Sequence, residues 1–153
     1  RDYQKRSDIC VVLLEMCEDV AKRARTAGYV GRTISLGLSY SQAAMTKGFY
    51  RSKTIEEPTN DTMTLYAVCK ELLDTHFVGE PARQLSVRLS NVEQANSIQL
   101  DLFDTDKEKR QTLAHTVDTI RDKFGATAVL RAASYTEAGT ALERNRLVGG
   151  HLA

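Results

Sequence analysis

Apolar residues recur at spacings of three and four near the start of the chain, which predicts an amphipathic helix. This stripe consists of Ile9, Leu13, Met16, Cys17, Val20 and Ala24. We expect the helix to begin at Ser7, a favourable N-cap, and to end at Gly28, because glycine readily adopts the left-handed backbone of a C-cap. The cations in its last turns suit the negative end of the helix dipole; they are Lys22, Arg23 and Arg25.

From residue 32 the period changes to two, which predicts strands over 32–40, 48–55 and 83–90. A second helix is expected between the last two, because Pro58 should end a strand and one of the next three residues, Thr59, Asn60 and Asp61, should cap a helix. Its apolar face consists of Leu65, Val68, Cys69 and Leu72. The order helix, strand, strand, helix, strand predicts an α+β domain with both helices on one face of an antiparallel sheet.

The other face of this sheet, called here the bare face, is small, hydroxylic and basic. It consists of Thr33, Ser35, Gly37, Ser39, Ser52, Thr54, Ser86, Arg88 and Ser90, edged by Arg32, Arg51, Lys53 and Arg83. An ordinary solvated face would also be rich in serine and threonine. Small residues, however, let a polyanion approach closely, so that hydroxyls and cations contact phosphate oxygens. Tyr50 is a lone aromatic there, so the face favours binding of a duplex backbone over stacking on single-stranded bases.

Residues 91–97 are polar and lack periodicity, which predicts a flexible linker. The linker leads into an apolar pentapeptide, Gln99-Leu100-Asp101-Leu102-Phe103. Two interpretations stay open from these residues alone: an edge strand, or an extended peptide that docks in a partner through a few anchors.

A third helix is expected after the pentapeptide, because Thr105 and Glu108 form a capping box and Gly125 provides a stop. Its narrow apolar stripe consists of Leu113, Val117, Ile120 and Phe124. A stripe this small must pack on something, either the preceding domain or a protein partner, including a second copy of the chain. We expect a short strand over 129–133 and a weakly ordered tail beyond it.

Composition adds a few limits. The chain has 153 residues, enough for one domain with appendages, and its 21 basic and 20 acidic residues leave a net charge that neither favours nor excludes nucleic acid. Cys10, Cys17 and Cys69 lie in helical patterns without metal-ligand spacing, which favours reduced thiols and a cytoplasmic location. No apolar run approaches the roughly 18 residues of a membrane span, so no membrane partner is expected. His76 is expected to be a packed or a surface histidine rather than a metal ligand. Because the sequence starts at Arg1 rather than at a methionine, we expect it to be a fragment of a longer protein.

Three segments carry a family resemblance: 31–37, 48–55 and 83–90 resemble strands of the little-finger domain of Y-family translesion DNA polymerases, in the UmuC-like (ImpB/MucB/SamB) branch. The resemblance implies a β-α-β-β-α-β fold whose first strand precedes Arg1, and a domain that lies in the DNA major groove and touches phosphates. It implies contacts to duplex DNA by Arg32, Thr33, Arg51, Ser52, Lys53, Thr54, Arg83 and Arg88.

The pentapeptide is similar to the bacterial sliding-clamp-binding motif, Gln-Leu-(Ser/Asp)-Leu-Phe. This likeness implies that Gln99 occupies a polar sub-pocket of the clamp, that Leu102 and Phe103 fill an apolar one, and that Leu100 and Asp101 lie between them. The implied organisation is a DNA-binding domain over 1–91, a linker with the clamp motif over 92–104, and a C-terminal helix and tail over 105–153.

No catalytic constellation is evident in the sequence, so the implied function is DNA grip and clamp tethering during SOS-associated damage bypass. The Mg²⁺ carboxylates of polymerase chemistry would lie in a catalytic core outside this chain, which itself needs no cofactor. The alternative is an α+β protein-interaction module that does not bind DNA.

Overall fold

The computed structural model describes residues 2–42, 44–95, 105–126, 129–136, 138–144, 147–148 and 151–152. The chain divides into two compact units, Arg1–Asn96 and Ser97–Ala153, which are described separately. None of the helices in the described ranges is both long and apolar enough to cross a membrane.

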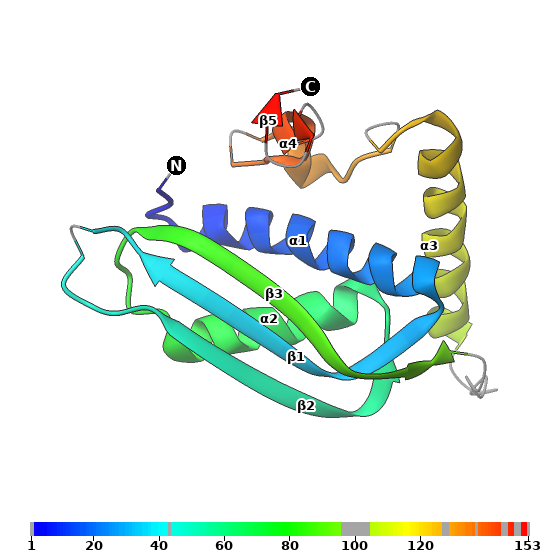
Figure 1. Cartoon of the computed structure of the whole chain (residues 1–153), viewed down its shortest axis with the longest axis horizontal. Helices are drawn as coiled ribbons and strands as arrows, with labels where there is room; N and C mark the ends of the chain where they lie inside the picture. The colour runs from blue at the N-terminus through cyan, green and yellow to red at the C-terminus, as the bar shows by residue number, and fades with distance from the viewer. Residues whose placement is uncertain are drawn as a thin grey trace. The chain divides into compact units, whose positions relative to one another are not determined.

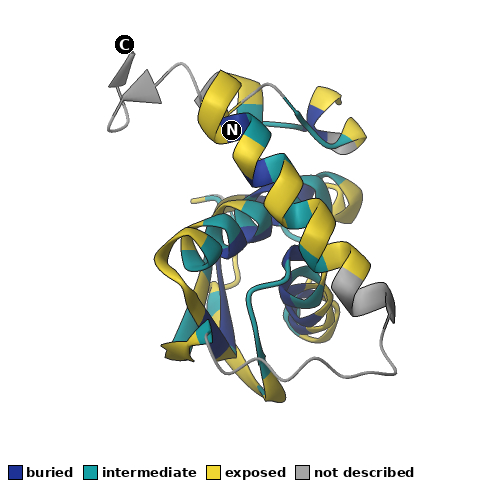
Figure 2. Ribbon diagram, turned by 90° about the vertical axis from the view of Figure 1, so that its right-hand side faces the viewer, coloured by how far each residue is buried: buried dark blue, intermediate teal, exposed yellow. Residues whose placement is uncertain are grey.

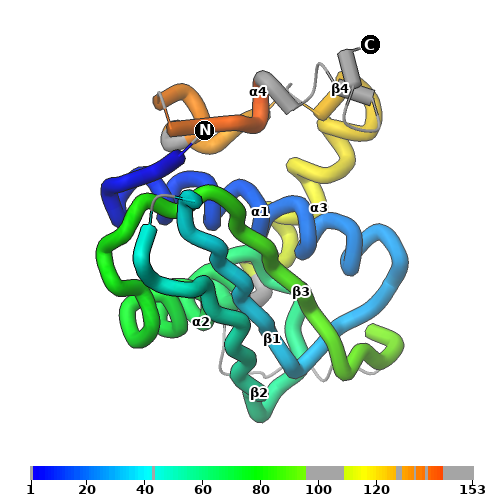
Figure 3. Tube along the Cα trace, turned by 60° about the vertical axis from the view of Figure 1, so that its left-hand side comes forward, coloured from blue at the N-terminus to red at the C-terminus, as the bar shows by residue number. Residues whose placement is uncertain are grey.

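The first unit has the predicted order of elements (Figure 1). They are α1 (Arg6–Ala27), β1 (Tyr29–Tyr40), β2 (Phe49–Thr59), α2 (Thr62–His76) and β3 (Ala82–Gln94). The three strands form an antiparallel sheet in the order β2-β1-β3, and the trace of β1 runs between its two partners in Figure 3. The α+β prediction is therefore confirmed.

Both helices pack on the same face of the sheet. The core joins one face of β1 to the apolar stripes of α1 and α2, and consists mainly of Ile9, Leu13, Cys17, Ile34, Leu36, Leu38, Leu65, Cys69 and Leu73. In Figure 2 the buried parts of the strands, drawn dark blue, lie on the side of the sheet that the helices cover. At about 25 cal/mol per Å² of apolar surface removed from water, this layer is the main stabilising contribution to the unit.

The ends of the two helices follow local chemistry, with one correction. Gly28 terminates α1 in the left-handed region at φ 76°, as predicted, and Asp61 caps α2 by accepting a hydrogen bond from the Thr64 amide at 3.0 Å. The prediction that Ser7 caps α1 is wrong: Lys5 holds the N-cap position without a side-chain bond, and Ser7 lies inside the first turn. The helix therefore begins one residue before Ser7, the residue with the best capping chemistry.

All three strands are longer than predicted, and β1 begins at Tyr29 rather than at residue 32. β2 continues through Pro58 to Thr59, because β2 is an edge strand, where a missing amide donor is tolerated. β3 continues to Gln94, and its polar end pairs with the start of β1, with Val30 opposite Glu93. Residues 91–94 are therefore strand and not the start of a linker, since backbone pairing does not require apolar side chains.

The outer edge of β3 receives the N-terminal segment of the chain. Tyr3 and Ala82 exchange two backbone hydrogen bonds of 2.8 Å in an isolated antiparallel bridge. Beyond the bridge, a cavity of about 540 Å³ lies between α1 and this edge, with Met16 and Leu85 among its lining residues. The additional strand implied by the family resemblance stays a prediction.

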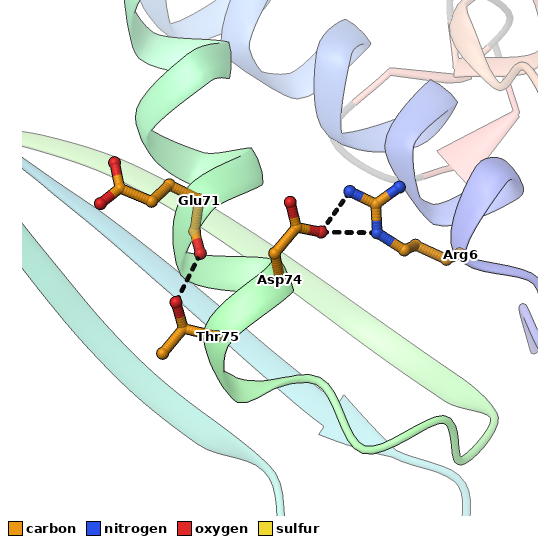
Figure 4. A network of polar contacts seen from close by, with 4 residues as sticks. All are labelled: Arg6, Glu71, Asp74 and Thr75. Carbon is orange, nitrogen blue, oxygen red and sulfur yellow. Dashed lines mark hydrogen bonds and ion pairs between the residues drawn. The ribbon is translucent and has the colours of Figure 1, made fainter.

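A polar network ties the start of α1 to the end of α2 (Figure 4). The Arg6 guanidinium donates two hydrogen bonds to Oδ1 of Asp74, and on α2 the Thr75 hydroxyl donates to the Glu71 carbonyl at 3.0 Å. The bond to Asp74 is the main cause that raises the pKa of Arg6. Because both partners are exposed, we expect this pair to fix the helix ends more than to stabilise the fold.

The first described element of the second unit is α3 (Thr105–Phe124), which ends at Gly125 with φ 104° as predicted. The short strand expected over 129–133 is wrong: Ala132–Tyr135 forms a 3-10 helix, and the Arg121 side chain donates to the Val129 carbonyl at 2.7 and 2.9 Å. The part of 129–133 that has regular structure, from Ala132 onward, is therefore helical. The tail contains α4 (Ala141–Arg144) and a two-stranded antiparallel ribbon, β4 (Leu147–Val148) with β5 (His151–Leu152).

Candidate nucleic-acid interface

Strand register sorts the predicted contact residues by face. Across β1 and β2, Thr33 faces Thr54, Ser35 faces Ser52 and Gly37 faces Tyr50. On the other side of β1, the same three residues face Ser90, Arg88 and Ser86. Because directly opposed residues share a face, these nine residues form three rows across the face opposite the helices. Among the described residues of the first unit, no helix packs on this face.

Hydroxyl groups bond to one another along these rows. The Thr33 and Thr54 Oγ1 atoms are 3.0 Å apart, and the Ser35 and Ser52 Oγ atoms are 2.7 Å apart. Each hydroxyl has one hydrogen and two lone pairs, so a pair bonded to each other still has one hydrogen for a further acceptor. Ser52 and Thr54 are the exposed members of these pairs and can offer that hydrogen to an anion on the face, whereas Ser35 is buried.

Gly37 keeps the third row close to the backbone. A Cβ built at this position would collide with the Ser86 Oγ and would lie 3.2 Å from the Tyr50 ring. The two cross-strand neighbours thus close over the glycine, and any larger residue would raise the surface. Tyr50 itself is 53% exposed on this face, the position expected for the lone aromatic.

The cations divide between the faces. Arg88 is exposed and lies opposite Ser35, so it belongs to the bare face. Lys53 and Arg51 instead lie opposite Ile34 and Leu36, which are core residues on the helix side. Lys53 there forms an ion pair with Glu71 of α2, Nζ to Oε2, at 2.8 Å. The register therefore does not bring Lys53 and Arg51 together with the hydroxyl rows.

The two remaining predicted cations lie at irregular points of the sheet. The Arg32 Nη1 donates to the Glu56 carbonyl at 2.9 Å, beside the shift of register between β1 and β2. Arg83 is exposed and lies at the register shift between β1 and β3. Ser39 faces Gln84 and Tyr40 faces Ala82, so Arg83 is left without a residue of β1 opposite it. Both flank the bare face at opposite ends of β1, which agrees with the edge positions expected for them.

Sequence reasoning missed one member of the bare face, Asn91. It was assigned to the linker, but its Nδ2 donates to the Thr33 Oγ1 at 2.6 Å. Asn91 has φ 52°, the one positive φ among non-glycine residues of the described ranges. Asparagine is the residue type that tolerates this conformation best after glycine, so its occurrence directly after an alternating strand was the available signal.

The rest of the first unit offers little chemistry. Cys17 and Cys69 lie side by side in the core, and the hydrogen bond between the thiols, with burial, raises the pKa of Cys17 well above its usual range. Burial, together with the neighbouring Cys10 thiol, raises the pKa of Tyr66 to about 12. His76 packs against the ring of Phe49, with ring centroids 5.6 Å apart. The described ranges contain no group of three or more His, Cys, Asp or Glu side chains placed to hold a metal ion.

The predicted clamp motif, Gln99 to Phe103, lies outside the described residues. Its docking role therefore stays a prediction from the sequence.

Comparison with known proteins identifies the family. The model of the impB/mucB/samB family C-terminal domain matches residues 1–102. A Bacillus subtilis (strain 168) protein named UvrX, for UV-damage repair, is 52% identical over 151 residues, which cover 99% of this chain. DNA polymerase IV 2 of Halalkalibacterium halodurans is 42% identical over 150 residues, or 98% of this chain, and its Bacillus subtilis namesake is 41% identical over 152 residues, or 99%.

The chain belongs to the impB/mucB/samB family, of which it contains the C-terminal domain. The resemblance to the UmuC-like branch of Y-family polymerases is thereby confirmed. The chain spans little more than a third of the relatives it matches, 36% of UvrX and of the Halalkalibacterium halodurans polymerase and 37% of the Bacillus subtilis polymerase.

Proposed function

We propose that the first unit holds duplex DNA by its phosphate backbone on the bare face, as the non-catalytic grip of a Y-family translesion polymerase. The observation that supports this proposal is the arrangement of aligned hydroxyl pairs, Thr33 with Thr54 and Ser35 with Ser52, beside the cation of Arg88. Neutral donors and a flanking cation fit phosphate oxygens, and phosphate contacts carry no sequence information directly. Membership of a family whose relatives are named DNA polymerases agrees with it.

The proposed contacts are narrower than the sequence implied. Thr33, Ser52, Thr54 and Arg88 form the central group, and Arg32 and Arg83 flank it. Arg51 and Lys53 lie on the helix side and contribute only to the general field of the domain. In this proposal the polymerase reaction, with the carboxylates that hold Mg²⁺, takes place in a part of the parent protein outside this chain. The proposed location is the cytoplasm, where such a polymerase meets DNA.

The pentapeptide supplies the second half of the proposal. Gln99, Leu102 and Phe103 dock in a bacterial sliding clamp, with Leu100 and Asp101 between them. A tether of this kind raises the effective concentration of a weakly bound polymerase at its template. The second unit, with its exposed Leu113 and Phe124, is proposed as a contact for a further protein or a second copy.

A salt titration of duplex binding by the whole chain tests the grip. A backbone-binding face predicts that the logarithm of the association constant falls linearly with the logarithm of salt concentration, with a slope near 0.9 per neutralised phosphate. Duplexes of unrelated sequence should give the same line. Absence of binding at low salt, or binding that ignores salt, would instead favour a protein-interaction module.

A further inference from the structure

A chain of hydrogen bonds crosses the bare face at the end of its first row. The Asn91 Nδ2 lies 2.6 Å from the Thr33 Oγ1, which in turn lies 3.0 Å from the Thr54 Oγ1. The three residues come from β3, β1 and β2, so the chain spans the whole width of the sheet. No other hydrogen bond of the Thr54 hydroxyl occurs within the described ranges.

The backbone of Asn91 is what brings its amide to this face. Regular alternation would place residue 91 on the side of Leu89, with the core, and not on the side of Ser90. The left-handed conformation, φ 52°, breaks the alternation and turns the side chain to the Thr33 hydroxyl. Asparagine is one of the few non-glycine residue types that adopt this conformation readily, so the position suits the residue that occupies it.

One direction in this series of hydrogen bonds is fixed by the groups involved: an amide nitrogen only donates, so Thr33 accepts from Asn91. Either hydroxyl of the Thr33–Thr54 pair can donate to the other. In the arrangement in which Thr33 donates, Thr54 keeps its own hydrogen for a group outside the protein. A phosphate oxygen only accepts, so a ligand of this kind fits that arrangement.

We propose that Asn91 is a positioning residue of the DNA interface: it sets the direction of the Thr33 and Thr54 hydroxyls so that Thr54 donates to a phosphate oxygen. This inference rests on the proposed grip of duplex DNA. It adds Asn91 to the interface and assigns a direction to the hydrogen bonds of Thr33 and Thr54. Neither the strand residues that resemble the family nor the family match supplies these two points.

A double-mutant cycle on duplex binding tests the proposal, with fluorescence anisotropy of a labelled duplex and the whole chain. Asn91→Gly keeps the left-handed backbone and removes the amide, and Thr54→Val removes the final donor without changing the size of the side chain. We expect Thr54→Val to weaken binding about three- to tenfold and Asn91→Gly to weaken it by less. The double variant should bind as weakly as Thr54→Val alone, because the amide acts only through the hydroxyl. Losses that multiply in the double variant would overturn the proposal.

A charge-matched pair provides the second readout. Asn91→Asp reverses the direction of these hydrogen bonds. A carboxylate only accepts, so Thr33 donates to the introduced carboxylate and Thr54 then donates to Thr33. Gln84→Glu adds the same charge on the same face, where Gln84 already accepts from the Ser39 hydroxyl. Asn91→Asp should weaken binding at least several-fold more than Gln84→Glu, and equal losses would contradict the inference.

The outcomes separate the two levels of the proposal. If the unaltered chain binds duplex DNA but the losses of affinity multiply in the double variant, the proposed DNA binding is supported and the role of Asn91 is refuted. If the unaltered chain does not bind at low salt, both are refuted. Thermal unfolding of each variant confirms that a change in affinity does not come from a change in fold.

Discussion

Lys53 and Glu71 form an ion pair on the helix side of the sheet, with the lysine Nζ 2.8 Å from the carboxylate Oε2. This pair marks a strand cation that points away from the hydroxyl rows, although it lies between Ser52 and Thr54 in the sequence. Arg88 occupies the opposite face. The two cations therefore offer a matched comparison between the faces of one sheet.

We predict that Arg88→Gln weakens duplex binding about tenfold at low salt, because it removes a phosphate contact, and lowers the salt slope by about 0.9. Lys53→Gln removes the same charge from the other face and should change affinity less than threefold. Filter binding over a range of salt concentrations measures both quantities. Equal losses from the two variants would show that only net charge matters.

Gly28 provides a test of the fold that is independent of DNA. Its φ of 76° is left-handed, and a Cβ added there meets no atom within 4 Å. Gly28→Ala should therefore destabilise the domain through backbone strain alone, by about 1 kcal/mol. Gly28→Asn should cost less, because asparagine tolerates this conformation. Urea unfolding of both variants checks the order; an alanine variant as stable as the original would contradict it.

The raised pKa of Tyr66 predicts that the domain loses stability at alkaline pH. Its pKa is about 12 in the folded domain against 10.0 for an ordinary tyrosine, because burial disfavours the phenolate. Between these values the unfolded chain loses the proton and the folded chain keeps it, so the free energy of unfolding falls as pH rises. Below pH 10 Tyr66 is protonated in both the folded and the unfolded chain, so its full contribution to the free energy of unfolding is present.

Tyr66→Phe removes the titrating group and should reduce the loss of stability between about pH 8 and about pH 11. The raised pKa of Cys17 contributes to the alkaline loss in both proteins, so the comparison isolates the tyrosine. Denaturant unfolding at the two pH values gives the result. Identical losses in the two proteins would mean that Tyr66 titrates alike in the folded and unfolded states.

The clamp motif is tested by replacing its anchors. Leu102→Ala combined with Phe103→Ala should abolish recovery of a bacterial sliding clamp in a pull-down, because apolar anchors carry most of the energy of such peptides. Asp101→Ser is the control, since the motif accepts either residue there, and it should leave recovery unchanged. Full recovery with both anchors removed would refute the assignment.

The sequence predicted the sheet well because alternation is a local signal. Ile34, Leu36 and Leu38 identified one face of β1, and the small polar residues between them identified the other. The same alternation places Lys53 and Thr54 on opposite faces of the sheet, although both were predicted to contact DNA. Register across the strands, and not composition, decides which face a cation joins.

The features that could not be predicted depend on backbone pairing. The polar end of β3 reads as linker, but its amides and carbonyls pair with β1 from Tyr29 onward. Asn91 joins the bare face through one backbone torsion, which no periodicity reveals. Gly28, in contrast, was predictable because its conformation is one that glycine is selected to supply.

The most direct test of the account is to map backbone amide chemical shifts of the isotopically labelled chain as a short duplex is added. We predict that the largest changes occur on the bare face, at Thr33, Ser35, Ser52, Thr54, Ser86 and Arg88, and that the exposed residues of α2 change little. Changes confined to α1 and α2, with the hydroxyl rows unaffected, would contradict the central claim that this face holds DNA.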